Sequence, residues 1–195
     1  MMKTLVFATN NPHKLKEIKA KVGDSFEIKS LEDIDVNEDI PEPYETLDEN
    51  AFNKARHIHE RYGYDCFADD TGLEIDALAG SPGVYSARYA GPQCNFQDNI
   101  NKVLDEMENE TYRSARFRCV IALILNGKEY KFEGAVEGKI LTEEHGSEGF
   151  GYDPVFQPEG YEQSFAEMPL ETKNQISHRG RAVAKLTEFL REKAE

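Results

Sequence analysis

Two adjacent carboxylates, Asp69 and Asp70, are the residues of this sequence that point most directly to chemistry. They follow the apolar run Cys66-Phe67-Ala68, which is typical of a buried strand, so we expect them at the end of that strand. Neighbouring carboxylates repel each other unless a cation or hydrogen bonds compensate. With Glu42 from an acidic loop they could hold a magnesium ion and leave one carboxylate to deprotonate water. A turn over residues 69–72 that ends the strand explains the same residues.

A second candidate site is the run Thr9-Asn10-Asn11-Pro12-His13-Lys14, which follows the first predicted strand. Asn11 is expected to cap a helix, and Pro12 suits its first turn. The N–H groups at such a helix start attract anions, and Lys14 adds a positive charge, so a phosphate could bind there. An ordinary capped helix is the alternative, because the run is not a Walker loop.

A polar stripe lies along the second predicted helix. Asn50, Lys54, His57 and Arg61 recur at spacings of four, three and four, which places them on one face. Lys54 could reach a phosphate from that face, whereas His57 is assigned no role. A solvated helix surface is the alternative explanation of the stripe.

The segment Gly149-Phe150-Gly151-Tyr152-Asp153-Pro154 could bind a flat ligand. Glycines on both sides of Phe150 allow a close approach of the backbone, and a nucleobase could stack on the ring. Asp153 could accept a hydrogen bond from the edge of that base. A tight turn around a packed aromatic side chain is the alternative.

Basic residues gather where the last helix should begin, at Ser177-His178-Arg179, with Lys173 just upstream. Positive charge opposes the dipole at a helix start, and a broken local rule often marks a functional position. The guanidinium of Arg179 only donates hydrogen bonds, so it suits the 6-keto oxygen of a purine and not the 6-amino group of adenine. A basic surface cluster remains the other interpretation.

Alternation and helical spacing predict the elements that must position these residues. The first is a strand over 4–8, followed by a helix with Leu15, Ile18 and Val22 inward and a strand over 26–31. A Thr-x-x-Glu capping box at Thr46 begins the second helix after an acidic loop over 32–45. Further along we expect a strand over 73–78, a polar helix over 95–108, a hairpin of 116–126 and 129–140 turning at Asn126-Gly127, and an amphipathic helix over 177–193.

Length and charge narrow the class of protein. The 195 residues suffice for one domain, or for two lobes that share a core, and the net charge of -14 argues against a nucleic-acid polymer as partner. No segment is apolar for long enough to span a membrane, so the cytoplasm is the expected location. The three cysteines show no paired spacing and are each expected to be small buried residues in a reducing compartment.

Taken together, six segments resemble the inosine triphosphate pyrophosphatase family, and the resemblance covers nearly the whole chain. The segments that carry it are residues 9–14, Glu49-Asn50-Ala51, 67–73, 82–89, 149–154 and 177–180. The resemblance implies a two-lobed α/β fold over residues 1–195, with a long twisted mixed sheet flanked by helices and a nucleotide cleft between the lobes. It also implies a homodimer, and an enzyme that uses Mg²⁺ to hydrolyse ITP, dITP or XTP to the monophosphate and pyrophosphate.

The resemblance also assigns roles residue by residue. Asp70 is the base that activates water, and Glu42 and Asp70 bind the magnesium ion, although Glu38, Asp39 and Glu45 are acidic neighbours of Glu42. Residues that hold the triphosphate and the sugar and base are Thr9, Asn10, Asn11, Pro12, His13, Lys14, Lys54, Thr71, Phe150, Gly151, Tyr152, Asp153, Lys173, His178 and Arg179. Asp69 receives no role.

Three other functions remain open at this point. A regulatory protein could bind a purine triphosphate without hydrolysing it, and an acidic interaction module could carry the same turns and caps. A third alternative, a pyrophosphatase for modified pyrimidine triphosphates, would catalyse the same kind of reaction as the expected enzyme. A panel of substrates that measures released pyrophosphate separates all three from the expected enzyme.

Overall fold

The computed structural model describes residues 3–22 and 26–194. Residues 1–2, 23–25 and 195, which the expected domain includes, lie outside the described residues. The chain divides into two compact units. The first unit consists of Met1–Asp70, Cys119–Gly134 and Arg179–Glu195, and the second of Thr71–Arg118 and Ala135–His178.

Seven described strands form one mixed sheet. They are β1 (Lys3–Phe7), β2 (Phe26–Lys29), β3 (Cys66–Ile75), β4 (Pro82–Gly83), β5 (Ser114–Leu125), β6 (Lys128–Ile140) and β7 (Phe156–Pro158). The strand order is β2-β1-β3-β5-β6-β7, and β4 pairs with β3. β1 runs parallel to β2 and β3, whereas β4 is antiparallel to β3 and β7 to β6. The expected mixed sheet is confirmed.

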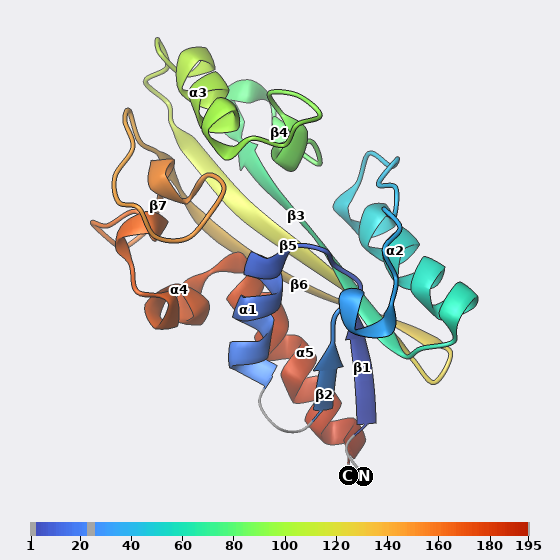
Figure 1. Ribbon diagram of the computed structural model, residues 1–195. Helices are drawn as coiled ribbons and strands as arrows, with labels where there is room; N and C mark the ends of the chain where they lie inside the picture. Colours follow the sequence, from blue (N-terminus) through green and yellow to red (C-terminus); the bar gives the residue numbers. More distant parts are fainter. Residues whose placement is uncertain (1–2, 23–25, 195) are drawn as a thin grey trace. The chain divides into compact units, whose positions relative to one another are not determined.

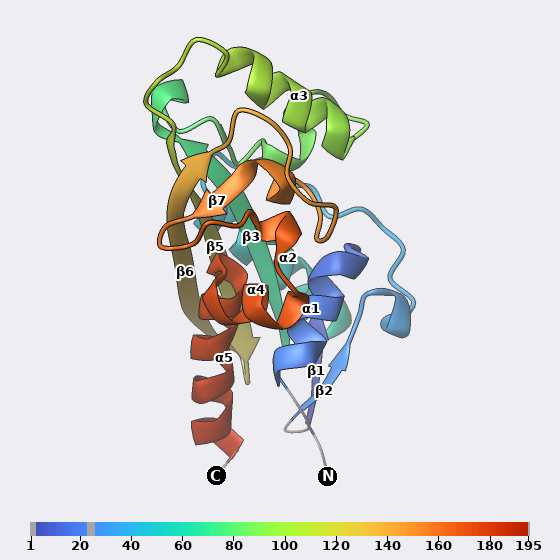
Figure 2. The same ribbon diagram turned by 90° about the vertical axis from the view of Figure 1, so that its left-hand side faces the viewer.

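Three helices cover the sheet of the first unit. They are α1 (Pro12–Val22), α2 (Leu47–Tyr62) and α5 (His178–Ala194). Figure 1 and Figure 2 show α1 and α5 on one side of β1 and β3 and α2 on the other. The core on the α1 side contains the stacked rings of Phe7 and Phe67, whose centroids are 4.6 Å apart, together with Ile18 of α1 and Leu186 of α5. As expected, Leu186 lies on the buried face of the last helix.

The second unit has a core of its own. It contains the helices α3 (Phe96–Glu106) and α4 (Leu170–Ile176), of which the sequence predicted only the first. Phe117 of β5 contacts Phe156 of β7 edge to face with 4.6 Å between ring centroids, and Val103 of α3 joins the same buried cluster. Short 3-10 helices of this unit span residues 76–78, 86–88, 153–155 and 165–167.

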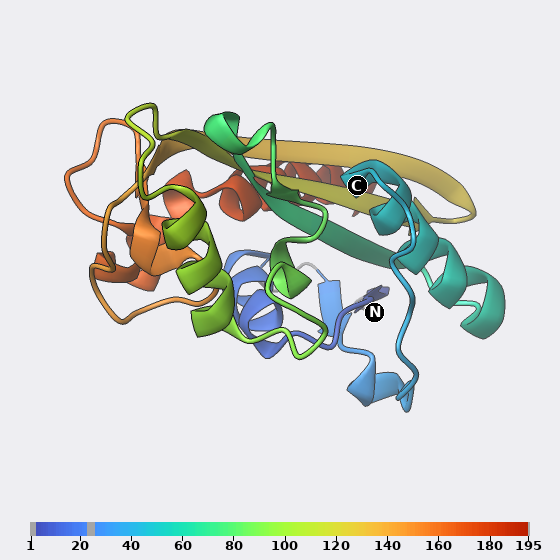
Figure 3. The same cartoon turned by 90° about the horizontal axis from the view of Figure 1, so that it is seen from above.

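Local sequence signals place several of these elements correctly. Thr46 caps α2 by accepting a hydrogen bond from the backbone N–H of Glu49 at 3.2 Å, as the capping box predicts. Asn126 and Gly127 have φ of 51° and 72°, the positive values that a two-residue type I′ hairpin turn requires. Figure 3 shows this turn between β5 and β6 next to α2.

Three expectations are wrong. β3 runs without a break from Cys66 to Ile75, so Asp69 and Asp70 lie inside a strand and not in a turn at its end. Within this strand Lys14 and Arg179 compensate the carboxylate of Asp69. The predicted strand over 73–78 ends earlier, in the 3-10 helix Asp76–Leu78. Cys94 is exposed, whereas Cys66 and Cys119 are buried as expected.

No helix within the described ranges is long and apolar enough to cross a membrane.

Candidate active site

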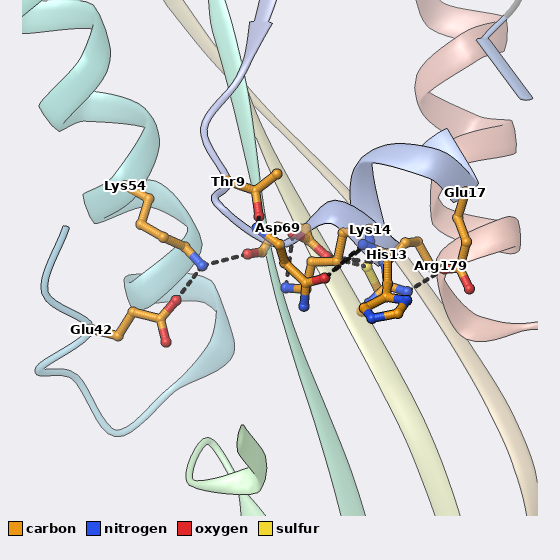
Figure 4. Close-up of polar contacts among 10 residues, drawn as sticks. Thr9, His13, Lys14, Glu17, Glu42, Lys54, Asp69 and Arg179 are labelled. Atoms are coloured by element: carbon orange, nitrogen blue, oxygen red, sulfur yellow. Dashed lines mark hydrogen bonds and ion pairs between the residues drawn. The ribbon is translucent and has the colours of Figure 1, made fainter. Parts of the chain in front are cut away.

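Asp69 lies among three cationic side chains of the first unit (Figure 4). Its side chain is buried, and one carboxylate oxygen accepts a hydrogen bond from Lys14 Nζ at 3.0 Å. The other accepts from Arg179 Nε at 3.3 Å, and the backbone carbonyl of Asp69 accepts from Lys54 Nζ at 2.6 Å. Burial by itself would raise the pKa of Asp69, but Lys14 and Arg179 hold it far below its usual range. Asp69 therefore stays ionised, and both of its carboxylate oxygens are hydrogen-bonded to cations.

Asp70 has a different environment, because successive residues of a strand point to opposite faces. It is also buried, and burial raises its pKa to about 6; Lys54 opposes this rise and the carboxylate of Glu42 adds to it. A carboxylate with a pKa just below neutrality is still ionised at neutral pH and accepts protons more readily than an ordinary aspartate. Of the two neighbours, Asp70 is thus the better general base.

Glu42 is held in this group of charges by α2. Its carboxylate accepts a short hydrogen bond from Lys54, drawn in Figure 4. Burial would raise the pKa of Glu42, yet the ammonium of Lys54 outweighs it and the pKa is lowered. Asn50 Nδ2 donates to the carbonyl of Tyr44, and Asn50 Oδ1 accepts from the N–H of the same residue. Asn50 is fully buried, so this part of the polar stripe is not a solvated surface.

The acidic neighbour Glu38 has other partners. Its carboxylate contacts His57 Nε2 at 3.0 Å and accepts from Arg61 Nη1 at 3.1 Å and from the hydroxyl of Tyr62 at 2.5 Å. The last two residues of the polar stripe, His57 and Arg61, thus hold a different part of the acidic loop. This arrangement supports Glu42 over Glu38 as the acid that acts with Asp70.

The start of α1 is capped as the sequence predicts. Asn11 Oδ1 accepts from the N–H groups of His13 and Lys14 at 2.9 and 3.3 Å. The N–H of Asn11 itself donates to Thr9 Oγ1 at 3.1 Å, which orders the run from Thr9 to Lys14. Two of the N–H groups that would attract an anion are therefore engaged by Asn11, and Lys14 is the charged group that the run supplies.

Arg179 is buried on the same side as Lys14. Besides Asp69, its guanidinium contacts Glu17 of α1 through a short hydrogen bond (Figure 4). Burial would lower the pKa of Arg179, but Glu17 and Asp69 raise it, so the guanidinium is permanently charged. Basic charge at the start of α5, which the helix dipole disfavours, is explained here by two buried carboxylates. The base-reading role expected for Arg179 stays a prediction.

The second unit holds the aromatic segment and a buried ion pair. Asp153 Oδ2 accepts from Lys173 Nζ at 2.7 Å and from the backbone N–H of Phe150 at 3.0 Å. The ammonium of Lys173 lies 4.9 Å from the centroid of the Phe150 ring. Gly149 and Gly151 both have positive φ, of 74° and 60°, and a side chain at Gly149 would collide with Asp153. These contacts fix the position of Phe150.

Two further predicted residues lie in this unit with well-defined contacts. The hydroxyl of Tyr152 donates to the carbonyl of Ser86 at 2.6 Å, and the imidazole of His178 stacks on Phe117 with 4.7 Å between centroids. Thr71 follows Asp70 in β3 and is half-buried.

The structure thus sorts the predicted residues into two groups. The first unit contains residues 9–14, Glu42, Lys54, Asp70 and Arg179, and the second contains Thr71, 150–153, Lys173 and His178. Sequence reasoning gave Asp69 no role and missed Glu17. The one available signal for Glu17 is its helical spacing of three from Lys14, on the side of α1 that carries the buried Ile18.

The donor chemistry of Glu42 and Asp70 fits a magnesium ion. Within residues 3–22 and 26–194, no group of three or more acidic, histidine or cysteine side chains is arranged to hold a metal ion. Mg²⁺ commonly binds one or two carboxylates and completes its shell with water and substrate phosphates, so a pair is sufficient. Burial raises the pKa of Asp70, and repulsion between its carboxylate and that of Glu42 adds to the rise. A divalent cation relieves that repulsion.

Comparisons with known proteins agree with this site. A protein of Flavobacterium johnsoniae called dITP/XTP pyrophosphatase is 55% identical over 186 residues, which is 95% of this chain and 97% of that protein. The solved structures of Ham1 proteins from Staphylococcus aureus and Coxiella burnetii are 36% and 39% identical, and each has a TM-score of 0.90. Each comparison covers 98% of this chain and 100% of the other. The sequence profile of the Ham1 family matches residues 5–189, and the chain belongs to that family.

Proposed function

We propose that this protein hydrolyses non-standard purine nucleoside triphosphates, such as ITP, dITP and XTP, to the nucleoside monophosphate and pyrophosphate. This activity removes such nucleotides from the pool and prevents their incorporation into DNA and RNA. The names of relatives that are more than half identical support the reaction. The observation that carries it in this chain is the environment of Asp70, a buried carboxylate whose charge interacts with those of Lys54 and Glu42.

Asp70 serves as the general base. It accepts a proton from a water molecule as the water oxygen attacks the α-phosphorus, and the bond from that phosphorus to the oxygen bridging the β-phosphorus breaks. Pyrophosphate leaves with the bridging oxygen. Asp69 is unsuited to this step, because Lys14 and Arg179 occupy its carboxylate and depress its pKa.

Cationic groups of the first unit hold the triphosphate. Lys14 and Lys54 neutralise the phosphate oxygens, and the run from Thr9 to His13 supplies further polar contacts at the start of α1. Both lysines have carboxylate partners in the structure, Asp69 for Lys14 and Glu42 for Lys54. These partners keep each ammonium in place before substrate binds, so less ordering is needed on binding.

Glu42 and Asp70 would hold the magnesium ion. When bound, the ion supplies positive charge that stabilises the negative charge developing on the phosphates. The protein itself holds the Glu42 carboxylate in place through Lys54 of α2.

Residues of the second unit contact the base and sugar. Phe150 offers its ring for stacking, and Gly151, Tyr152 and Asp153 continue the same segment. Lys173, His178 and the next residue, Arg179 of the first unit, donate hydrogen bonds to the purine. Thr71 contacts the substrate close to Asp70. A donor that faces a 6-keto oxygen is satisfied, whereas the 6-amino group of adenine leaves it unpaired.

We further propose that residues 1–195 act as one catalytic domain, as a homodimer in the cytoplasm, without a nucleic-acid or membrane partner.

The test is a substrate panel. Purified protein is given ITP, XTP, dITP, ATP, GTP and a modified pyrimidine triphosphate with Mg²⁺, and released pyrophosphate is measured. We expect rapid release from the first three, and no release after chelation of the metal until Mg²⁺ is restored. Binding of ITP without release of pyrophosphate would refute the enzyme, and preferential release from the pyrimidine would refute the purine specificity.

A further inference from the structure

Phe96, the first residue of α3, lies beside the aromatic segment of the second unit. Its ring centroid is 6.1 Å from that of Phe150, and the two ring planes are inclined by 44°. The residue is 42% exposed, so part of its ring surface is open to a ligand. Its partner is the ring on which the proposed function places the purine.

The structure holds both rings in place by separate means. Asn95 caps α3 by accepting from the N–H of Asp98 at 3.0 Å, so Phe96 begins a fixed helix. Gln97 Nε2 donates to Glu144 Oε2 at 2.8 Å, which fastens the start of α3 to the segment that leads to Phe150. Phe150 is fixed in turn through Asp153 and Lys173.

We propose that Phe96 is a substrate-binding residue that gives the purine a second aromatic contact next to Phe150. This inference rests on the proposed function. Two rings at 44° form an open angle, so a flat base stacked on one ring presents its edge to the other. Phe96 contributes apolar surface and no charge, so it increases the affinity for the base and takes no part in the reaction at phosphorus.

The absence of tryptophan from the sequence makes a direct measurement possible. In a Phe96→Trp variant the introduced indole is the sole tryptophan emitter. We expect its fluorescence to change and saturate with inosine monophosphate, which carries the base, and not with pyrophosphate, which does not. A Tyr112→Trp variant is the matched control, because Tyr112 is also in the second unit and is 62% exposed. Its emission should not respond to either ligand.

Kinetics provide a second readout that a structural role would not reproduce. Phe96→Ala should raise KM for ITP about 2- to 12-fold, the range that corresponds to losing one edge-to-face aromatic contact, while kcat stays within about twofold. Phe96→Tyr keeps the ring and should restore KM. A fall in kcat with unchanged KM, or equal losses in the Tyr and Ala variants, would mean that Phe96 only supports the fold.

The outcomes also separate this inference from the proposed function. If calorimetry shows that inosine monophosphate binds to the Phe96→Trp variant but the emission stays constant, Phe96 does not contact the base and the inference is wrong. If the tryptophan emission of the Phe96→Trp variant changes with protein concentration in the absence of ligand, position 96 lies in an interface between copies of the chain. This result would also overturn the inference. If the wild-type protein neither binds inosine monophosphate nor hydrolyses ITP, the proposed function fails and the inference fails with it.

Discussion

The two units use their buried charges differently. In the first unit, a single residue, Asp69, contacts three cations. Its carboxylate contacts Lys14 and Arg179, and its backbone carbonyl contacts Lys54. In the second, one ion pair between Lys173 and Asp153 lies against the ring of Phe150. Charged groups thus dominate the first set of predicted site residues, and aromatic surface dominates the second.

This difference suggests a division of labour. Charges placed before substrate arrives suit a triphosphate, which is the same in every nucleotide. Aromatic surface with a few donors suits a base, which differs among nucleotides. We therefore expect substitutions in the first unit to affect all nucleotides alike and substitutions in the second to change the choice among bases.

The largest effect should come from Asp70→Asn. Losing a general base lowers kcat by roughly two to four orders of magnitude, and the fold should persist because the side chain keeps its shape. The loss should be the same for ITP and XTP. Pyrophosphate release is measured for both after circular dichroism has shown that the variant is folded. Near-normal turnover would remove Asp70 from the role of base.

Arg179 provides the sharpest test of the division, because it belongs to the charged cluster of the first unit and yet is expected to read the base. ITP should be preferred over ATP by several orders of magnitude, since one mismatched buried donor costs about 1 to 3 kcal/mol and the proposed site has several donors at the base. Arg179→Ala should narrow the ratio of kcat/KM for ITP to that for ATP. An unchanged ratio would assign base reading to Lys173 and His178 of the second unit.

Arg179→Ala also leaves Glu17 and Asp69 without a buried cation, which costs stability. Lys173→Met also removes a buried cation, but one that is proposed to donate to the base, so its ratio should narrow as well. Both ratios are taken only from protein whose unfolding transition lies above the assay temperature.

A smaller effect is expected from Lys14→Gln. Removing one charge-assisted contact to a phosphate should raise KM about ten- to a hundredfold, equally for ITP and XTP. Lys16→Gln is the matched control, because Lys16 is an exposed lysine of the same helix. A change in the ITP to XTP ratio with Lys14→Gln would show that the first unit also distinguishes bases.

The smallest effect concerns the stability of the metal-free protein. The pKa of Asp70 is raised from 3.8 to about 6, so ionised Asp70 destabilises the fold above pH 6 and the penalty disappears below pH 3.8. Asp70→Asn removes the penalty and should stabilise the protein at pH 8 by at most about 3 kcal/mol. Urea unfolding at pH 8 and pH 5 measures the gain, which should be smaller at pH 5. Equal gains at both pH values would contradict the raised pKa.

Features that depend on neighbouring residues could be predicted from the sequence. The cap at Thr46, the cap at Asn11 and the hairpin turn at Asn126-Gly127 each follow from local hydrogen bonding or backbone preference, and the structure contains all three. The resemblance supplied the family, which the comparisons confirm.

The charged cluster could not be predicted in the same way. Lys14 and Asp69 are 55 positions apart, and Arg179 is 110 positions from Asp69, so no local pattern relates them. The same cause produced the error over β3, because two adjacent aspartates favour a turn until their distant cations are known. α4 was missed because its seven residues give too short a periodic pattern.

The hydrogen bonds between residues 41–44 and α2 limit where residues can be inserted in the acidic loop. Asn53 donates to the carbonyl of Pro41, Lys54 contacts Glu42, and Asn50 binds both backbone groups of Tyr44. Side chains of α2 thus hold residues 41, 42 and 44, and an inserted residue between Glu42 and Asn50 would move the Glu42 carboxylate away from Lys54. Insertions are tolerated where backbone groups are not so engaged. Length variation in the acidic loop should therefore accumulate before Pro41, while the interval from Glu42 to Asn50 stays constant.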